Sequence, residues 1–201
     1  MSTSQDKLEL DIHARIVDAA HIRFRHYGYS KTTMAEIAAD TGMSAANLYR
    51  YFNSKRDIIA ECANRCMCER IDRLRTAIRK PELNAIERLK SYVLTDLNMS
   101  HEMAESDKKI SELVNTITQE RADMIYRKIK AENSLIAEIL SYGNETGEFD
   151  INDINATADT IHTSLVAFNV PIFMSLYSLE EFKEKATSMV ELLVNGLVKR
   201  H

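Results

Sequence analysis

The side chains best suited to chemistry lie close together in the first third of the sequence, and they are hydrogen-bonding rather than catalytic types. Asn47 carries an amide that can pair with base edges, and Tyr49 and Tyr51 carry hydroxyls that can reach phosphate oxygens. Ala45 and Ala46 stand just before them and are small enough to let a helix approach a groove closely. These residue types in this order predict contact with double-stranded DNA.

No catalytic motif accompanies this group. The sequence lacks a glycine-rich phosphate loop, a G-x-S-x-G elbow and an H-E-x-x-H motif. His13, His21 and His26 follow one helical stretch without partners at metal-ligand spacing. We therefore expect no enzyme, no metal site and no cofactor.

Local signals position the candidate contacts in a helix-turn-helix, which we place at residues 32–56. Thr33 and Glu36 have the spacing of a capping box for a short helix, about residues 34–40. Gly42 supplies the turn, and Ser44 can cap a second helix whose free N–H groups form a phosphate site. Lys55 adds a point charge near the same backbone.

Helical periodicity continues on both sides of this motif. An apolar stripe over residues 12–27 predicts a first helix that ends at Gly28, and Leu48 and Phe52 anchor the second helix of the motif to the core. A long helix is expected over about residues 55–79 and ends before Pro81. Five further helices are expected, at about residues 82–103, 107–117, 119–146, 153–175 and 178–199.

The fold class is therefore all-α, with about nine helices. A three-helix N-terminal bundle over residues 1–56 forms the DNA-binding domain, and the long helix joins it to a helical ligand-binding and dimerisation domain over residues 57–201. The charge distribution permits this division, because residues 1–56 carry 8 basic and 6 acidic side chains and residues 57–201 carry 18 and 24.

The N-terminal region resembles the DNA-binding domain of the tetracycline-repressor (TetR/AcrR) family over roughly the first 60 residues. The rest of the chain is similar to that family only in layout. The residues that carry the resemblance are Phe24 to Tyr29, Thr32-Thr33-Met34, Ile37-Ala38, Gly42-Met43-Ser44, Asn47 to Phe52 and Ser54-Lys55.

The resemblance implies a role for each candidate contact. Phosphate contacts would come from Thr33, Ser44, Tyr49, Tyr51 and Lys55, and base contacts from Ala45, Ala46 and Asn47. Tyr51 replaces a histidine that is common in the family, so its role is open between phosphate and base. Arg50 is open between a DNA contact and a solvated position.

A regulator of this family needs an effector cavity and a dimer surface in its C-terminal domain. The cavity candidates are aromatic, methionine and polar residues that could equally be plain core: Met67, Tyr92, Met99, Met103, Leu113, Ile117, Met124, Phe168, Asn169 and Phe173. The dimer candidates lie on apolar stripes of the last two helices: Ile161, Leu165, Ile172, Phe182, Met189, Leu193 and Leu197.

Three cysteines, Cys62, Cys66 and Cys68, stand on the long helix that joins the two expected domains. Their spacing matches no standard zinc motif, so buried inert thiols are favoured over a sensor. No signal peptide is evident, and no apolar run approaches the ~20 residues that span a bilayer, so we expect no membrane contact and a cytoplasmic location.

The sequence thus predicts a homodimeric repressor that a small apolar effector releases from a palindromic operator. Two alternatives stay open. One is a DNA-binding regulator without a small-molecule effector, and the other is a helical small-molecule-binding protein that has lost operator binding.

Overall fold

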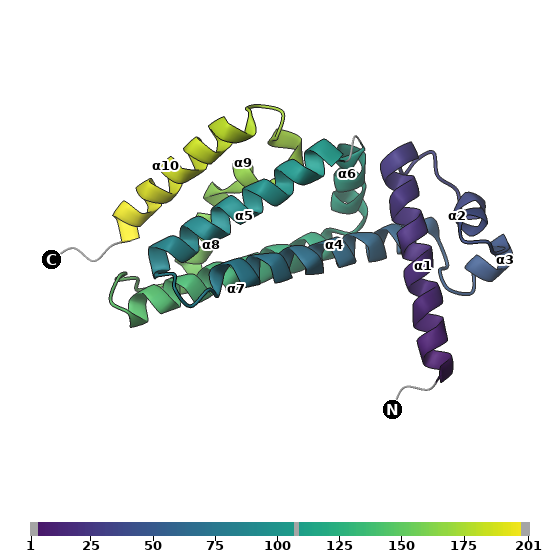
Figure 1. The fold of residues 1–201 in the computed structure, drawn as a ribbon, viewed down its shortest axis with the longest axis horizontal. Coiled ribbons are helices and arrows are strands. Elements are labelled where there is room, and N and C mark those ends of the chain that lie inside the picture. The colour runs from purple at the N-terminus through teal and green to yellow at the C-terminus, as the bar shows by residue number, and fades with distance from the viewer. Residues whose placement is uncertain (1–3, 107–108, 198–201) are drawn as a thin grey trace. The chain divides into compact units, whose positions relative to one another are not determined.

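The computed structural model describes residues 4–106 and 109–197, and each regular element in that part is a helix (Figure 1). The fold class expected from the sequence is confirmed. The α-helices are α1 Ser4–Tyr27, α2 Met34–Asp40, α3 Ala45–Leu48, α4 Lys55–Ile78, α5 Ala85–Ser106, α6 Ile110–Glu120, α7 Ala122–Glu145, α8 Ile154–Ser164, α9 Val166–Asn169 and α10 Leu179–Leu197. A short 3-10 helix, η1, spans Pro171–Phe173.

The described chain divides into two compact units. The first holds residues up to 67 together with residues 109–125, and the second holds residues 68–106 and 126–197. Helix α4 and helix α7 each contribute residues to both units. The expected functional boundary at residue 56 stays a prediction.

The first unit is built by local signals that the sequence displays openly. Thr33 Oγ1 accepts a hydrogen bond from the N–H of Glu36, and the Glu36 carboxylate accepts from the N–H of Thr33 at 2.8 Å, which completes the capping box at the start of α2. Gly28 and Gly42 have φ values of +90° and +71°, a region that favours glycine. These residues end α1 and turn the chain after α2.

Helix α6 packs within the first unit although it follows the helix-turn-helix by more than 50 residues of sequence. Leu113 and Ile117 are buried in one apolar cluster with Phe24, Ile37 and Leu48. Helix α6 is therefore the fifth helix that contributes to this core, after α1, α2, α3 and α4, and it lies in the part of the sequence assigned to ligand binding and dimerisation.

The core of the second unit centres on α5, which lies alongside α10 and also packs against α9 and η1 (Figure 1). Leu89, Val93 and Leu97 of α5 are buried there with Phe182 and Ala186 of α10. Within the described residues no helix is both long enough and apolar enough to cross a membrane.

The single helix expected over residues 153–175 is wrong, and the described chain consequently has ten α-helices rather than nine. Helix α8 ends at Ser164, α9 adds one turn, and Val170 is extended with φ −109° and ψ 118°. Pro171 causes the second break, because its ring disfavours a helical conformation at the preceding residue and it has no N–H to donate.

Candidate functional site

The helix-turn-helix has buried residues that hold it on the core and exposed residues that face solvent. Leu48 and Phe52 are buried and hold α3 and the turn after it on the core of the first unit. Ala46, Arg50 and Tyr49 are exposed, and about half of the Tyr49 surface is accessible. Helix α3 and the turn that follows it thus offer a small residue, a phenol and a guanidinium toward solvent.

The two cap residues, Thr33 and Ser44, differ in whether their hydroxyl groups can still donate a hydrogen bond. Ser44 Oγ accepts from the N–H of Asn47 at 3.2 Å, so its own O–H can still be donated outward. Thr33 Oγ1 donates to Glu36 Oε2 at 2.8 Å, which occupies its proton. Ala45 and Asn47 are half-buried at the start of α3.

Lys55 has a structural task that sequence reasoning did not foresee. Its ammonium donates to the carbonyl oxygens of Tyr29 at 2.7 Å and Thr32 at 2.8 Å, and it stands 4.2 Å from the centroid of the Tyr29 ring. Burial lowers the pKa of Lys55, although Glu112 and Glu120 oppose that shift. Lys55 thereby ties the loop between α1 and α2 to the start of α4, and a phosphate contact would use its third N–H.

Tyr51 is half-buried and packs against the apolar core of the first unit, so its ring contributes to folding whatever its hydroxyl does.

Helix α6 contacts the same loop between α1 and α2 that Lys55 holds. Glu112 accepts from the N–H of Ser30 at 2.7 Å, and hydrogen bonds from the side chain and the backbone of Ser30 lower the pKa of Glu112. A Cβ at Gly28 would stand only 2.6 Å from Glu112 Oε2, so α6 approaches the loop closely.

The cavity candidates are distributed between the two units and do not form one cluster. Met67, Leu113 and Ile117 pack with the core of the first unit, and Met124 is also buried in that unit. In the second unit Tyr92, Met99, Phe168 and Asn169 are buried, while Met103 and Phe173 are partly accessible. The assignment of a cavity to these residues stays a prediction.

Sequence reasoning missed a cluster of buried polar side chains in the second unit. Arg70 of α4 stands 2.6 Å from Asp96 Oδ1 of α5, and its Nη2 also donates to Ser100 Oγ at 2.7 Å. Glu132 of α7 is fully buried and interacts with Lys128 at 2.7 Å and with His162 of α8 at 3.0 Å. The available signal was a polar residue at every fourth position of α5, Tyr92, Asp96 and Ser100, on an otherwise apolar face.

Opposing effects set the acidity of the buried carboxyls. Burial raises the pKa of Asp96, and the Arg70 charge opposes the shift without cancelling it. Burial alone would also raise the pKa of Glu132, but the His162 hydrogen bond and the Lys128 and Arg70 charges outweigh it, so its pKa is lowered. The cluster therefore holds its carboxyls in unlike environments within one apolar core.

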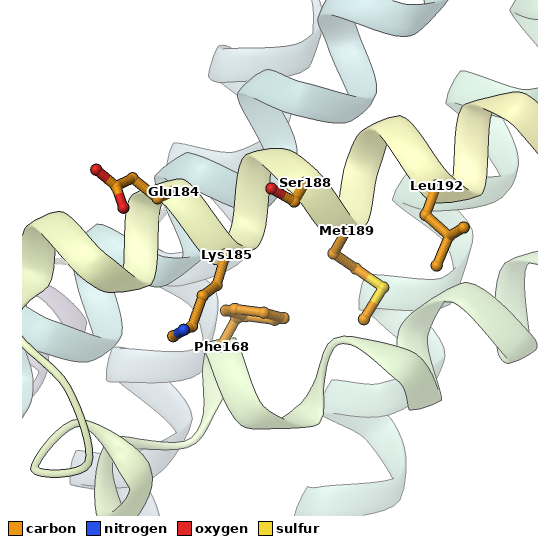
Figure 2. A pocket seen from close by; sticks show the side chains of 6 residues that line it. All are labelled: Phe168, Glu184, Lys185, Ser188, Met189 and Leu192. Atoms are coloured by element: carbon orange, nitrogen blue, oxygen red, sulfur yellow. The ribbon is translucent and has the colours of Figure 1, made fainter.

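A shallow groove of about 500 Å³ runs along α10 beside α9 (Figure 2). Phe168, Met189 and Leu192 provide its apolar lining, and Glu184 and Lys185 stand at one end. Leu192 is 69% exposed, so the apolar lining of the groove extends to the surface.

The dimer candidates take two different positions relative to this groove. Ile161, Leu165 and Phe182 are buried in the core of the second unit. Met189, Leu193 and Leu197 are half-buried, and Ile172 is exposed. A surface between copies would therefore use the second group together with Leu192.

The three cysteines differ in accessibility. Cys62 is buried, with its thiol 3.5 Å from the Val17 carbonyl oxygen, Cys66 is half-buried and Cys68 is exposed. In the described part of the chain no three metal-ligating side chains converge on one point.

We expect Cys62 to resist alkylation in the folded protein while Cys68 reacts readily. Burial raises the pKa of Cys62 to about 12, and the thiolate is the reactive form. Peptide mapping by mass spectrometry after brief iodoacetamide treatment measures the order, with protein unfolded in guanidinium as the control. Modification of Cys62 as fast as Cys68 would contradict the buried position.

The fold and the exposed face of α3 define a helix-turn-helix DNA-binding protein, and comparisons with known proteins identify its class. Residues 16–62 match the family described as bacterial regulatory proteins, tetR family, and residues 85–190 match the tetracyclin repressor-like C-terminal domain. The chain belongs to the TetR family of DNA-binding transcription regulators. A comparison with curated proteins gives no significant match.

Solved structures share the fold at low sequence identity. A transcriptional regulator from Cytophaga hutchinsonii ATCC 33406 is 24% identical, with 96% of this chain and 99% of that chain covered and a TM-score of 0.72. A TetR transcription regulator from Haloarcula marismortui ATCC 43049 is 16% identical, with 94% and 99% covered and a TM-score of 0.74. The SmeT–triclosan complex is 16% identical, with 94% and 92% covered and a TM-score of 0.67.

Proposed function

We propose that the protein is a homodimeric repressor that binds a palindromic operator through α3 and leaves it when a small, largely apolar molecule binds the second unit. The observation that carries the DNA-binding part of this proposal is the exposed surface of α3 and of the turn after it, where Tyr49 and Arg50 are accessible while Leu48 is buried in the core. A non-enzymatic role and a cytoplasmic location belong to the same proposal, because the DNA that it would bind lies there.

The proposed contacts divide by chemistry. Ala45, Ala46 and Asn47 would face base edges, since they occupy the start of a capped helix that can enter the major groove. Backbone N–H groups and the hydroxyls of Ser44 and Tyr49 would hold phosphates, with Thr33, Tyr51 and Lys55 nearby. The face carries few basic side chains, so hydrogen bonds to phosphate would provide most of the affinity.

The effector half of the proposal draws on a relative and on the core of the second unit. SmeT, which shares the fold, has been solved as a complex with triclosan. The second unit of this chain combines an apolar core with a buried polar cluster, a combination that suits a small molecule with one polar end. Helix α4 runs from this unit to the helix-turn-helix, so it can carry a displacement between them.

The third part of the proposal, the dimeric state, rests on the groove along α10. An exposed leucine beside Met189 and Phe168 leaves apolar surface that a second copy would cover. Two-fold pairing through this face would present two recognition helices to a palindrome.

Selection from a randomised duplex library, followed by gel shift, tests the DNA-binding half. We expect enrichment of a two-fold symmetric sequence at low salt and steep weakening as salt rises. An asymmetric enriched site would contradict the dimer, and no enrichment at any salt would favour the small-molecule-binding alternative. Absence of thermal stabilisation by apolar compounds would favour the regulator without an effector.

We expect Asn47→Ala to relax preference at one base position by ~1–3 kcal/mol and Tyr49→Phe to weaken all sequences equally. Asn47 donates its cap hydrogen bond through the backbone, so the alanine variant keeps the cap. Gel shift against single-base variants of the selected site measures both effects. Tyr126→Phe is the matched control, because Tyr126 is exposed but lies on α7 in the second unit. Uniform weakening by both variants would refute the division into base and phosphate contacts.

A further inference from the structure

The buried polar cluster of the second unit is unusual because its hydrogen bonding is incomplete in a specific way. Tyr92, Asp96 and Ser100 are each at most 3% exposed and lie one helical turn apart, so α5 presents a polar stripe to the interior of the unit. Facing this stripe are Arg70 of α4 and the Asn169 carbonyl of α9. Buried polar groups normally find partners, so each unmatched one calls for an explanation.

The two carboxylate oxygens of the cluster that lack hydrogen bonds each lie beside a cation. Asp96 Oδ1 makes no hydrogen bond of good geometry but lies 2.6 Å from Arg70 Nη2. Glu132 Oε1 likewise lies 2.7 Å from Lys128 Nζ. Both carboxylates therefore have their charge balanced within the cluster.

Two hydrogen-bond donors of the cluster lack an acceptor. Within the described residues the buried Tyr92 hydroxyl has no hydrogen-bond partner. Arg70 Nε also lacks a hydrogen-bond partner, although it lies 3.5 Å from Glu132 Oε1 in an ion pair. One of these buried donors comes from α5 and the other from α4. A buried donor without an acceptor lowers the free energy of unfolding, because it has lost its hydrogen bonds to water.

Charge decides which acceptor fits. Arg70 and Lys128 already balance Asp96 and Glu132, so a bound carboxylate would add an uncompensated negative charge to a low-dielectric core. A neutral oxygen adds no charge. We propose that the second unit binds an apolar molecule bearing a neutral carbonyl oxygen, which accepts hydrogen bonds from Tyr92 and Arg70. That this ligand acts as the effector rests on the proposed function. Its chemical class is inferred from the buried cluster alone.

Two short helical segments pack against α5 beside this cluster. Helix α9 has four residues and η1 has three, and both pack against α5. The Asn169 carbonyl at the end of α9 is held by Ser100 at 2.9 Å and Arg70 at 3.4 Å. A ligand that accepts a hydrogen bond from Arg70 Nε acts directly on α4, the helix that begins at Lys55.

Removal of the Tyr92 hydroxyl tests the unmatched donor without any ligand. We expect Tyr92→Phe to leave the Tm of the ligand-free protein unchanged or higher, because no hydrogen bond is lost. Ser100→Ala is the matched control on the same face of α5. It removes a hydroxyl that both accepts from Arg70 and donates to Asn169, and it should lower the Tm by about 2–4 °C or more. A comparable fall in Tyr92→Phe would overturn the proposal.

Three probes of nearly equal shape test the ligand chemistry by thermal shift: acetophenone, ethylbenzene and benzoate. We expect acetophenone to raise the Tm of the wild-type protein most, and Tyr92→Phe to weaken its binding by about 3–10-fold while ethylbenzene is unaffected. Equal shifts from acetophenone and ethylbenzene, the largest shift from benzoate, or no shift from any probe would each overturn the proposal.

Gel shift on the same samples separates this inference from the proposed function. If acetophenone binds but does not release operator DNA, the inferred ligand class is supported and its role as effector is refuted. Failure of the ligand-free protein to bind any duplex would refute the proposed function, while the thermal-shift comparison would still decide the ligand class.

Discussion

Replacement of Arg70 by methionine is expected to lower the free energy of unfolding by about 3–5 kcal/mol, the cost of leaving buried charges without their partner. Arg70 is 7% exposed, and it is the cation nearest to Asp96 and the second cation near the fully buried Glu132. The variant also removes the donor to Ser100 and the Asn169 carbonyl, which loosens α9. Chemical denaturation monitored by circular dichroism measures the loss.

Arg73→Met provides the matched control on the same helix. Arg73 pairs with Glu102, but both side chains are more than half exposed, so the change should cost less than about 1 kcal/mol. Asp96→Asn in the Arg70→Met background should recover part of the loss, since it removes one orphaned charge. Equal losses for Arg70→Met and Arg73→Met would contradict the buried network.

The loss in Arg70→Met should also depend on pH. Burial raises the pKa of Asp96, so the folded state takes up a proton at this group more readily than the unfolded state. The destabilisation should therefore shrink as the pH falls, because the orphaned Asp96 carboxyl becomes neutral. A loss that grows on acidification relative to wild type would contradict this assignment.

Gly143→Ala is expected to destabilise the protein by about 2 kcal/mol, although alanine is the better helix former by ~1 kcal/mol. Gly143 lies in α7, and a Cβ there would overlap the ring of buried Phe149, with Cε2 at 2.7 Å. The ring cannot withdraw easily, because the Phe149 and Glu148 N–H groups donate to the Gly143 carbonyl at 3.0 and 2.9 Å. Thermal and chemical denaturation measure the sum of the two effects.

Gly196→Ala isolates the helix-propensity part of that sum. Gly196 lies in α10 near its end, and no atom stands within 4 Å of an added Cβ. The variant should be neutral or more stable by up to about 1 kcal/mol. If both variants stabilise the protein, the close packing of Phe149 on Gly143 is wrong.

Sequence reasoning succeeded where the controlling interactions are short in range. The starts of α2 and α3 depend on Thr33 and Ser44, whose caps join residues three positions apart. The turn after α2 contains Gly42, which adopts a positive φ. Each of these signals is complete within one helical turn, so no knowledge of the fold was needed to recognise it.

The same reasoning could not assign the cluster around Arg70. Its partners Asp96, Ser100 and Asn169 lie 26, 30 and 99 residues away along the chain, and Glu132 and His162 come from two further helices. In sequence Arg70 is one of many basic residues on a helical face, and most such residues are solvated. Only packing of α4, α5, α7, α8 and α9 in one unit makes it buried.

The side chains between Thr33 and Lys55 illustrate both sides of this division. Their order alone determined a helix-turn-helix and the face of α3 that is available to DNA, because helical periodicity and caps are local properties. The tertiary structure decided that Lys55 ties the Tyr29 loop and that Glu112 of α6 holds Ser30. Those contacts join distant segments, so they depend on how the helices pack rather than on any pattern that the sequence displays.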